Sequence, residues 1–171
     1  LTTDKNIKKK IILLYNNNKN DIYKMGDMFY FLIKNIEYME TYIILMINQM
    51  LEDNISHIEL HIKLGWHFKI NNNSKIINLT IEEELEHFNK YKILFDNKNL
   101  SFKLIAQHSK STLKNVFNYF NTILNSKYLN LICYFDICCI NWKNKLNLFK
   151  KDVINILNII KEKNLNIYFN F

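Results

Sequence analysis

Proline and arginine do not occur in the 171 residues, and glycine occurs only twice. Two glycines exclude the glycine-rich loops, G-x-G-x-x-G and G-x-x-x-x-G-K, that hold nucleotide phosphates in doubly wound folds. The formal charge of +7 comes from scattered lysines. Because arginine is the side chain best suited to bidentate contacts with phosphate and guanine, its absence argues against nucleic acid as a partner.

Cysteine is also scarce, and its placement excludes two kinds of small fold. Cys133, Cys138 and Cys139 lie within seven positions, an odd cluster that is neither a disulfide framework nor the two spaced pairs of a zinc ribbon. Free thiols fit a reducing compartment. The apolar run over residues 42–51 is too short to span a bilayer, and no targeting segment is visible. We therefore expect a cytoplasmic protein without a membrane partner, and since the chain starts at Leu1 we expect it to be part of a longer polypeptide.

Apolar residues make up 49% of the chain, enough for one domain with a core, and their spacing alternates between two periods. Helical spacing predicts helices over residues 7–15 and 25–50. Thr80, followed three residues later by Glu83, predicts a capped helix start, and two further helices are predicted from Ser111 or Thr112 and over 148–163. Extended patterns predict strands over 55–64, 100–109, 129–137 and 165–171. The helix over 25–50 has a predicted buried stripe of Ile36, Met39, Ile43, Ile44, Ile47 and Leu51.

Alternation of helices and strands predicts βαβ units, a parallel sheet and right-handed crossovers. Repeats of roughly 30 to 50 residues are typical of a (β/α)8 barrel or a doubly wound sheet, and the shortage of glycine favours the barrel. We therefore expect an α/β fold that is part of a (β/α)8 TIM-type barrel. Residues 1–171 would form a single partial barrel segment, with a helical lead-in over 1–54 and alternating strands and helices over 55–171.

Polar side chains cluster where the predicted strands end, which is where such barrels place their sites. They are His57, Glu59, His61, Gln107, His108 and Asp136. Asp136 is the strongest candidate, with a helix cap or loop anchor as its alternative. His57, Glu59 and His61 share one strand face, which suits either metal ligation or an ordinary polar surface. His108 is either a site residue or a satisfied polar group, and Cys138 and Cys139 are reactive thiols or small buried hydrophobes.

Four segments together resemble the adenosine deaminase family: MLEDNISHIELHIKLG, SFKLIAQHSKS, LICYFDICC and IIKEKNLNIYFNF. The first is similar to the family's second barrel strand, where Glu59 and Leu60 match Glu-Leu-Arg and His61 stands in place of the arginine. The third is similar to its fourth strand, where residues 135–137 match Phe-Asp-Leu. The resemblance covers roughly residues 25–171, in the family's order and spacing.

The resemblance implies zinc-dependent hydrolytic deamination of adenosine or a related purine nucleoside or nucleotide. It implies substrate binding by Asp136 and by Cys139, which stands where the family has a glycine, and a site lined by Glu59, His61 and His108. The family's His-x-His motif and its other zinc ligands do not occur in this sequence, so no catalytic residue and no metal ligand is predicted here. Two other hypotheses stay open: a non-catalytic barrel kept for binding or assembly, and a basic ribonucleoprotein component.

Overall fold

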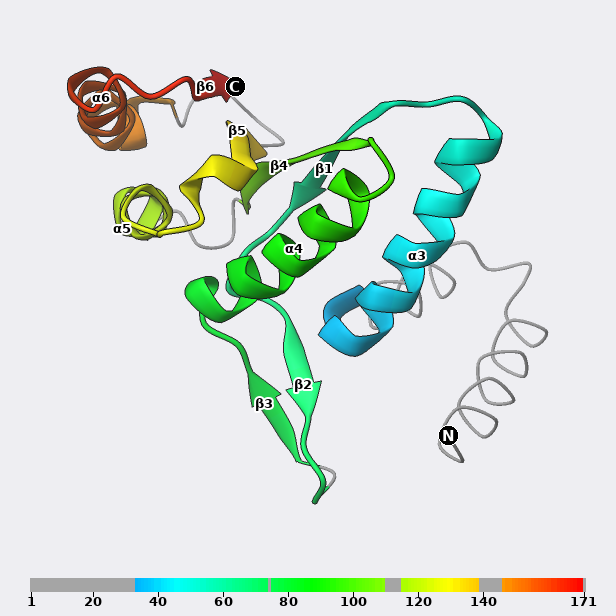
Figure 1. Ribbon diagram of the computed structural model, residues 1–171. Helices are drawn as coiled ribbons and strands as arrows, with labels where there is room; N and C mark the ends of the chain where they lie inside the picture. Colours follow the sequence, from blue (N-terminus) through cyan, green and yellow to red (C-terminus); the bar gives the residue numbers. More distant parts are fainter. Residues whose placement is uncertain (1–32, 74, 110–114, 139–145, 171) are drawn as a thin grey trace, which may run out of the picture.

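The computed structural model describes residues 33–73, 75–109, 115–138 and 146–170, which form a mixed α/β fold (Figure 1). A four-stranded parallel sheet has the order β1-β4-β5-β6, so its neighbouring strands follow one another along the chain. The predicted α/β class and the parallel sheet are confirmed. The strands are β1 (His57–Ile62), β4 (Ser101–Ser109), β5 (Ile132–Cys138) and β6 (Tyr168–Asn170).

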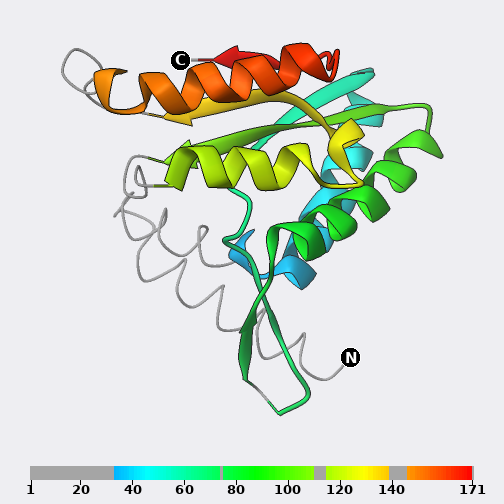
Figure 2. The same cartoon turned by 90° about the vertical axis from the view of Figure 1, so that its left-hand side faces the viewer.

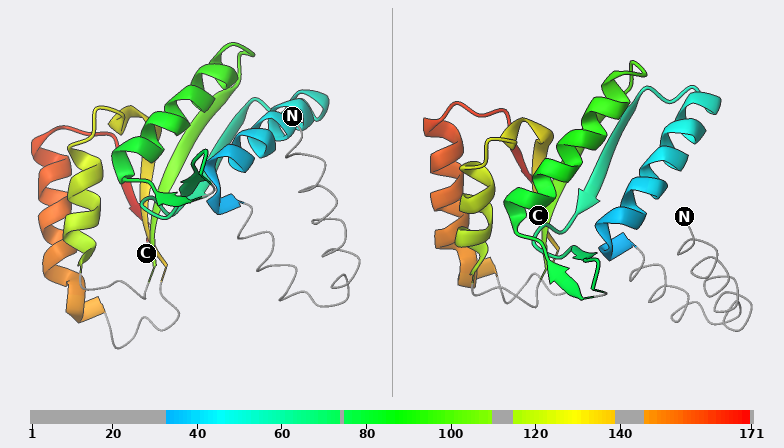
Figure 3. Two further views of the ribbon diagram at one scale, coloured as in Figure 1. Left: turned by 90° about the horizontal axis from the view of Figure 1, so that it is seen from below. Right: turned by 60° about the horizontal axis from the view of Figure 1, so that its bottom comes forward.

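The helices form one layer beside this sheet. Contacts between them follow chain order, from α3 to α4, from α4 to α5 and from α5 to α6, and the helices follow one another in an arc (Figure 3). Right-handed crossovers between parallel neighbours place successive helices on the same face. The helices are α3 (Ile36–Glu52), α4 (Ile81–Asp96), α5 (Val116–Leu124) and α6 (Leu146–Glu162).

Short polar side chains decide where these helices begin. Helix α3 starts after Asn35, whose side chain accepts a hydrogen bond from the Glu37 N–H at 3.0 Å. The prediction of one helix over 25–50 is therefore wrong at Asn35, because an asparagine cap starts a new helix there. The capping box of Thr80 and Glu83 at the start of α4 is confirmed.

Asparagine occupies the left-handed positions after three of the helices, where glycine is the usual residue. Asn54, Asn99 and Asn164 follow α3, α4 and α6 and have φ values of 56°, 57° and 50°. This left-handed backbone conformation is strained for most side chains but accessible to asparagine. A chain with two glycines can therefore still end its helices and turn into the next strand.

The core lies between the helix layer and the facing side of the sheet. Phe120 of α5 packs against Phe135 of β5 at 4.5 Å between ring centroids, and Phe95 of α4 stacks on Phe102 of β4 at 4.8 Å. On α3 the buried residues are Ile36, Met39, Ile43, Ile47 and Met50. The predicted burial of Ile44 and Leu51 is wrong, since they are 46% and 44% exposed, and Met50 takes the place at the end of the stripe.

A β-hairpin between β1 and α4 was not predicted. Strands β2 (Phe68–Ile70) and β3 (Ile76–Asn78) pair antiparallel and project away from the sheet (Figure 2). In the turn, the Asn71 side chain accepts hydrogen bonds from the N–H groups of Asn73 and Lys75. The three consecutive asparagines over residues 71–73 thus lie at the tip of the hairpin. Within the described ranges, no helix is long and apolar enough to cross a membrane.

Candidate functional site

Three polar side chains from three adjacent strands meet near the carboxyl ends of the sheet. The Nε2 of Gln107 in β4 donates to Oδ2 of Asp136 in β5 at 3.3 Å, and Nδ1 of His61 in β1 lies 3.8 Å from the same oxygen. The strand register places Gln107 opposite Asp136 and His61 opposite Ile105. Side chains alternate along a strand, so these three share the face opposite the helix layer. We call them the carboxyl-edge row.

The side chains of the row differ in their exposure to solvent. The side chain of Asp136 is 12% exposed, whereas that of His61 is 53% exposed. A carboxylate accepts hydrogen bonds, the Gln107 amide both donates and accepts, and the imidazole does either. A polar ligand with N–H groups and ring nitrogens on one edge would find partners for both kinds of atom here.

Glu59 faces the same side of the sheet but lies nearer the amino ends of the strands. It lines a groove of about 500 Å³ together with Lys103, Cys133, Tyr134 and Tyr168. Burial, and secondarily the charge of Glu59, raise the pKa of the Cys133 thiol to about 11, so Cys133 is not a nucleophilic thiolate near neutral pH. The side chain of Glu59 also contacts its neighbour on the same strand face, with its Oε1 3.3 Å from Nε2 of His57.

His108 does not join the row. Its ring packs against Tyr119 of α5 with centroids 4.9 Å apart, and the residue is 3% exposed. Because Gln107 faces the row, strand alternation turns His108 toward the helices. Burial, and secondarily the charge of Lys63, lower the pKa of His108. The expectation that His108 lines the site with His61 is thus corrected by its position.

The predicted substrate-binding residue Cys139 lies outside the described residues. Cys138, the last residue of β5, is opposite Ser109 of β4 in the sheet. Of the site residues predicted from the sequence, the structure brings together His61 and Asp136, leaves Glu59 on the same face of the sheet and separates His108 from them.

Glu84 holds the loop that follows β1, a role that the sequence analysis missed. Its carboxylate is fully buried and accepts hydrogen bonds from the N–H groups of Gly65, Trp66 and His67 at 2.9, 2.8 and 2.6 Å. The spacing of buried residues along α4 could have indicated that Glu84 is buried. Glu84 shares helical spacing with the buried Phe88, Tyr91 and Phe95, so it occupies a core position on α4.

Tyr119 connects the ends of β1 and β4. Its hydroxyl accepts a hydrogen bond from the Leu64 N–H and donates one to the Gln107 carbonyl, both at 3.0 Å. Burial raises the pKa of Tyr119, and its hydrogen bond with Leu64 opposes that shift, so the hydroxyl keeps its proton and can donate. This one side chain of α5 therefore holds the Leu64 N–H just after β1 and the Gln107 carbonyl in β4.

A zinc site does not fit the described residues. No group of three or more His, Cys, Asp or Glu side chains among them is arranged to hold a metal ion. His57, Glu59 and His61 share a strand face, yet His61 has Asp136 as its neighbour while His57 has Glu59.

Comparisons of the chain with protein-family models, with curated proteins and with solved structures found no match.

Proposed function

We propose that this chain is a segment of an adenosine deaminase-like (β/α)8 protein and that its carboxyl-edge row binds the base of a purine nucleoside. Two features of the fold support the barrel. The strands are parallel and run in chain order, as they do in a barrel. The helices form a single layer on one side, as the outer ring of a barrel does.

The observation that carries the proposal is the meeting of Asp136, Gln107 and His61 at the carboxyl edge. Active sites of barrels lie at this edge. A glutamine amide pairs with the exocyclic amine and ring nitrogen of adenine through one donor and one acceptor. A carboxylate beside it accepts a further hydrogen bond from an amine or a protonated ring nitrogen. The row thus offers a purine edge its complementary groups.

The role of these residues is to bind and orient the base. In the adenosine deaminase family zinc activates the water that attacks the base, but the family's zinc ligands do not occur in this sequence and the described residues do not fit a metal site. No chemical step is therefore assigned to them. Cys133 is a free thiol among the described residues, which supports a reducing, cytoplasmic location.

Calorimetric titration of the full chain with adenosine tests the proposal. Asp136→Asn should weaken adenosine binding about tenfold or more, because hydrogen bonds to a charged group contribute about 1.5–3 kcal/mol. Asp96→Asn is the matched control, since Asp96 is an exposed carboxylate on α4 that pairs with Lys92. Melting curves of both variants separate binding from stability. An Asp136→Asn variant that melts earlier and binds adenosine as the unchanged chain does would refute the proposal.

A further inference from the structure

The groove near the amino ends of the strands is a second place where side chains from several strands meet. Its volume of about 500 Å³ lies within the range of roughly 300–1,000 Å³ that small-molecule pockets occupy. The third residues of β1, β4 and β5 and the first residue of β6 line it: Glu59, Lys103, Tyr134 and Tyr168. Glu59 and Tyr134 each stand two positions before a residue of the carboxyl-edge row, so the groove and the row share the face opposite the helix layer.

Two tyrosines form an aromatic wall of this groove. Tyr134 and Tyr168 are partners in the register of β5 and β6, and their ring centroids are 5.3 Å apart with 34° between the ring planes. Tyr168 is 57% exposed, whereas Ile132 and Ile167, which also line the groove, are buried. The groove therefore exposes aromatic surface beside apolar side chains, a surface on which a further aromatic ring packs favourably.

Glu59 and Lys103 bring opposite charges to the groove from adjacent strands. Their Cα positions are partners in the register of β1 and β4, and neighbouring strands lie about 4.8 Å apart. Each charge has a different neighbour: Oε1 of Glu59 lies 3.3 Å from Nε2 of His57, and Nζ of Lys103 donates to the Asn130 carbonyl at 2.7 Å. Among the residues that the structure describes, no ion pair joins Glu59 to Lys103. An ammonium group has three donors and a carboxylate about four acceptor positions, so both keep capacity for a ligand.

Both charges act on the inside of the groove, where Cys133 responds to them. Burial raises the pKa of its thiol most, the charge of Glu59 raises it further, and the charge of Lys103 lowers it. The thiol keeps its proton near neutral pH and donates to the Leu104 carbonyl at 3.3 Å. A ligand with a single negative charge is repelled by Glu59, and one with a single positive charge is repelled by Lys103. The groove therefore favours a ligand that carries both charges.

We propose that this groove binds an aromatic α-amino acid. The ammonium and carboxylate groups of such a ligand are attached to one carbon, so they reach two side chains on neighbouring strands. The ammonium group pairs with Glu59 and the carboxylate with Lys103, in charged hydrogen bonds that are stronger than neutral ones. The ring of the ligand packs on the aromatic wall of Tyr134 and Tyr168.

Calorimetric titration of the full chain with L-tryptophan and three related compounds tests each contact separately. Tryptamine lacks the carboxylate and indole-3-propionate lacks the ammonium group, so each should bind about tenfold more weakly than tryptophan. L-Leucine keeps both charges but has no ring, and it should also bind about tenfold more weakly. These comparisons use the unchanged chain, so they do not depend on the folding of any variant.

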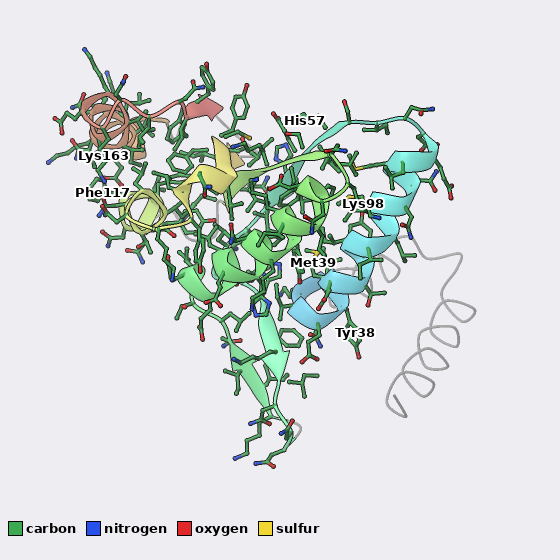
Figure 4. The ribbon with its side chains drawn as sticks, viewed as in Figure 1. Tyr38, Met39, His57, Lys98, Phe117 and Lys163 are labelled. Atoms are coloured by element: carbon green, nitrogen blue, oxygen red, sulfur yellow. The ribbon has the colours of Figure 1, made fainter. Side chains whose placement is uncertain are left out.

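Variants of the two charged side chains should show a crossed pattern. Glu59→Gln should weaken the binding of tryptophan and tryptamine about tenfold and change that of indole-3-propionate less than about threefold. Lys103→Gln should weaken tryptophan and indole-3-propionate about tenfold and change tryptamine less than about threefold. The matched controls are Glu52→Gln, at the exposed end of α3, and Lys98→Gln, at an exposed position after α4 (labelled in Figure 4), and both should change nothing.

Three results would overturn the proposal. They are no binding of tryptophan at millimolar concentration, equal binding of all four compounds, and a weakening by Glu52→Gln or Lys98→Gln as large as that by the groove variants. The proposal does not depend on the purine site. Tryptophan binding without adenosine binding refutes the purine proposal alone, and adenosine binding without tryptophan binding refutes this one alone.

Discussion

The carboxylate of Glu84 lies 2.9 Å from Nδ1 of His67, and the two side chains are 0% and 4% exposed. This contact links the first turn of α4 to the loop that follows β1. Gly65 at the start of the loop has a φ of 75°, a left-handed conformation that favours glycine. The turn brings three successive N–H groups to one carboxylate. A buried carboxylate that accepts three backbone N–H groups fixes this loop at the carboxyl edge of the sheet.

Replacing Glu84 by Gln should therefore destabilise the fold more than an exposed Glu would. A neutral amide presents an NH2 group to backbone donors and leaves some of them unsatisfied, at a cost of about 2–4 kcal/mol. Glu86→Gln is the matched control on the same helix, since Glu86 is 51% exposed and pairs with Lys90, and it should cost less than about 0.5 kcal/mol. Urea unfolding of both variants measures the difference, and equal midpoints would contradict this role of Glu84.

The hydroxyl of Tyr119 gives a second, independent prediction about the same edge. Tyr119→Phe removes the partner of both the Leu64 N–H and the Gln107 carbonyl. Because these groups are partly or fully buried, the loss should be about 1–3 kcal/mol of unfolding free energy. Amide hydrogen exchange at Leu64 should also become faster.

Tyr168→Phe serves as the control for Tyr119→Phe, since Tyr168 is 57% exposed on β6. It should change stability by less than about 0.5 kcal/mol. Unchanged exchange at Leu64 in Tyr119→Phe would show that the hydroxyl does not hold the loop.

The sheet was predictable because its signals are local. Each strand has an extended apolar pattern and each helix a helical one, and the alternation of the two gives a parallel sheet. The capping box at Thr80 needs only four residues. The hairpin was missed because β2 and β3 are three residues each, too short to show a period.

The site was predictable only in part because its geometry depends on register. His61 and Asp136 were both expected at strand ends, and they lie together. The pairing of β4 with β5 shifts between Leu104 and Ile105, and this irregularity decides that Gln107 lies opposite Asp136. No spacing in the sequence shows such a shift. Because side chains alternate along a strand, His108, which follows Gln107 in β4, points to the other face of the sheet.

The position of His108 leads to a prediction about pH. Its pKa is lowered in the folded chain by burial and then by the charge of Lys63. Above the ordinary histidine pKa of about 6.5 both states are neutral, so stability does not depend on this group. As the pH falls below that value, the unfolded chain binds a proton that the folded chain does not, and stability is lost until the pH reaches the lower folded pKa.

Stability should therefore decrease as the pH falls below about 6.5, and His108→Asn should reduce that decrease even if it lowers stability at every pH. His87 on α4 is a matched comparison, because burial and then the charge of Lys90 lower its pKa as well. It is only partly buried, so His87→Asn should reduce the decrease less. Urea unfolding at pH 7.5 and 5.5 measures both variants. An unchanged pH dependence in His108→Asn would mean that the ring is protonated in the folded chain as readily as in the unfolded one.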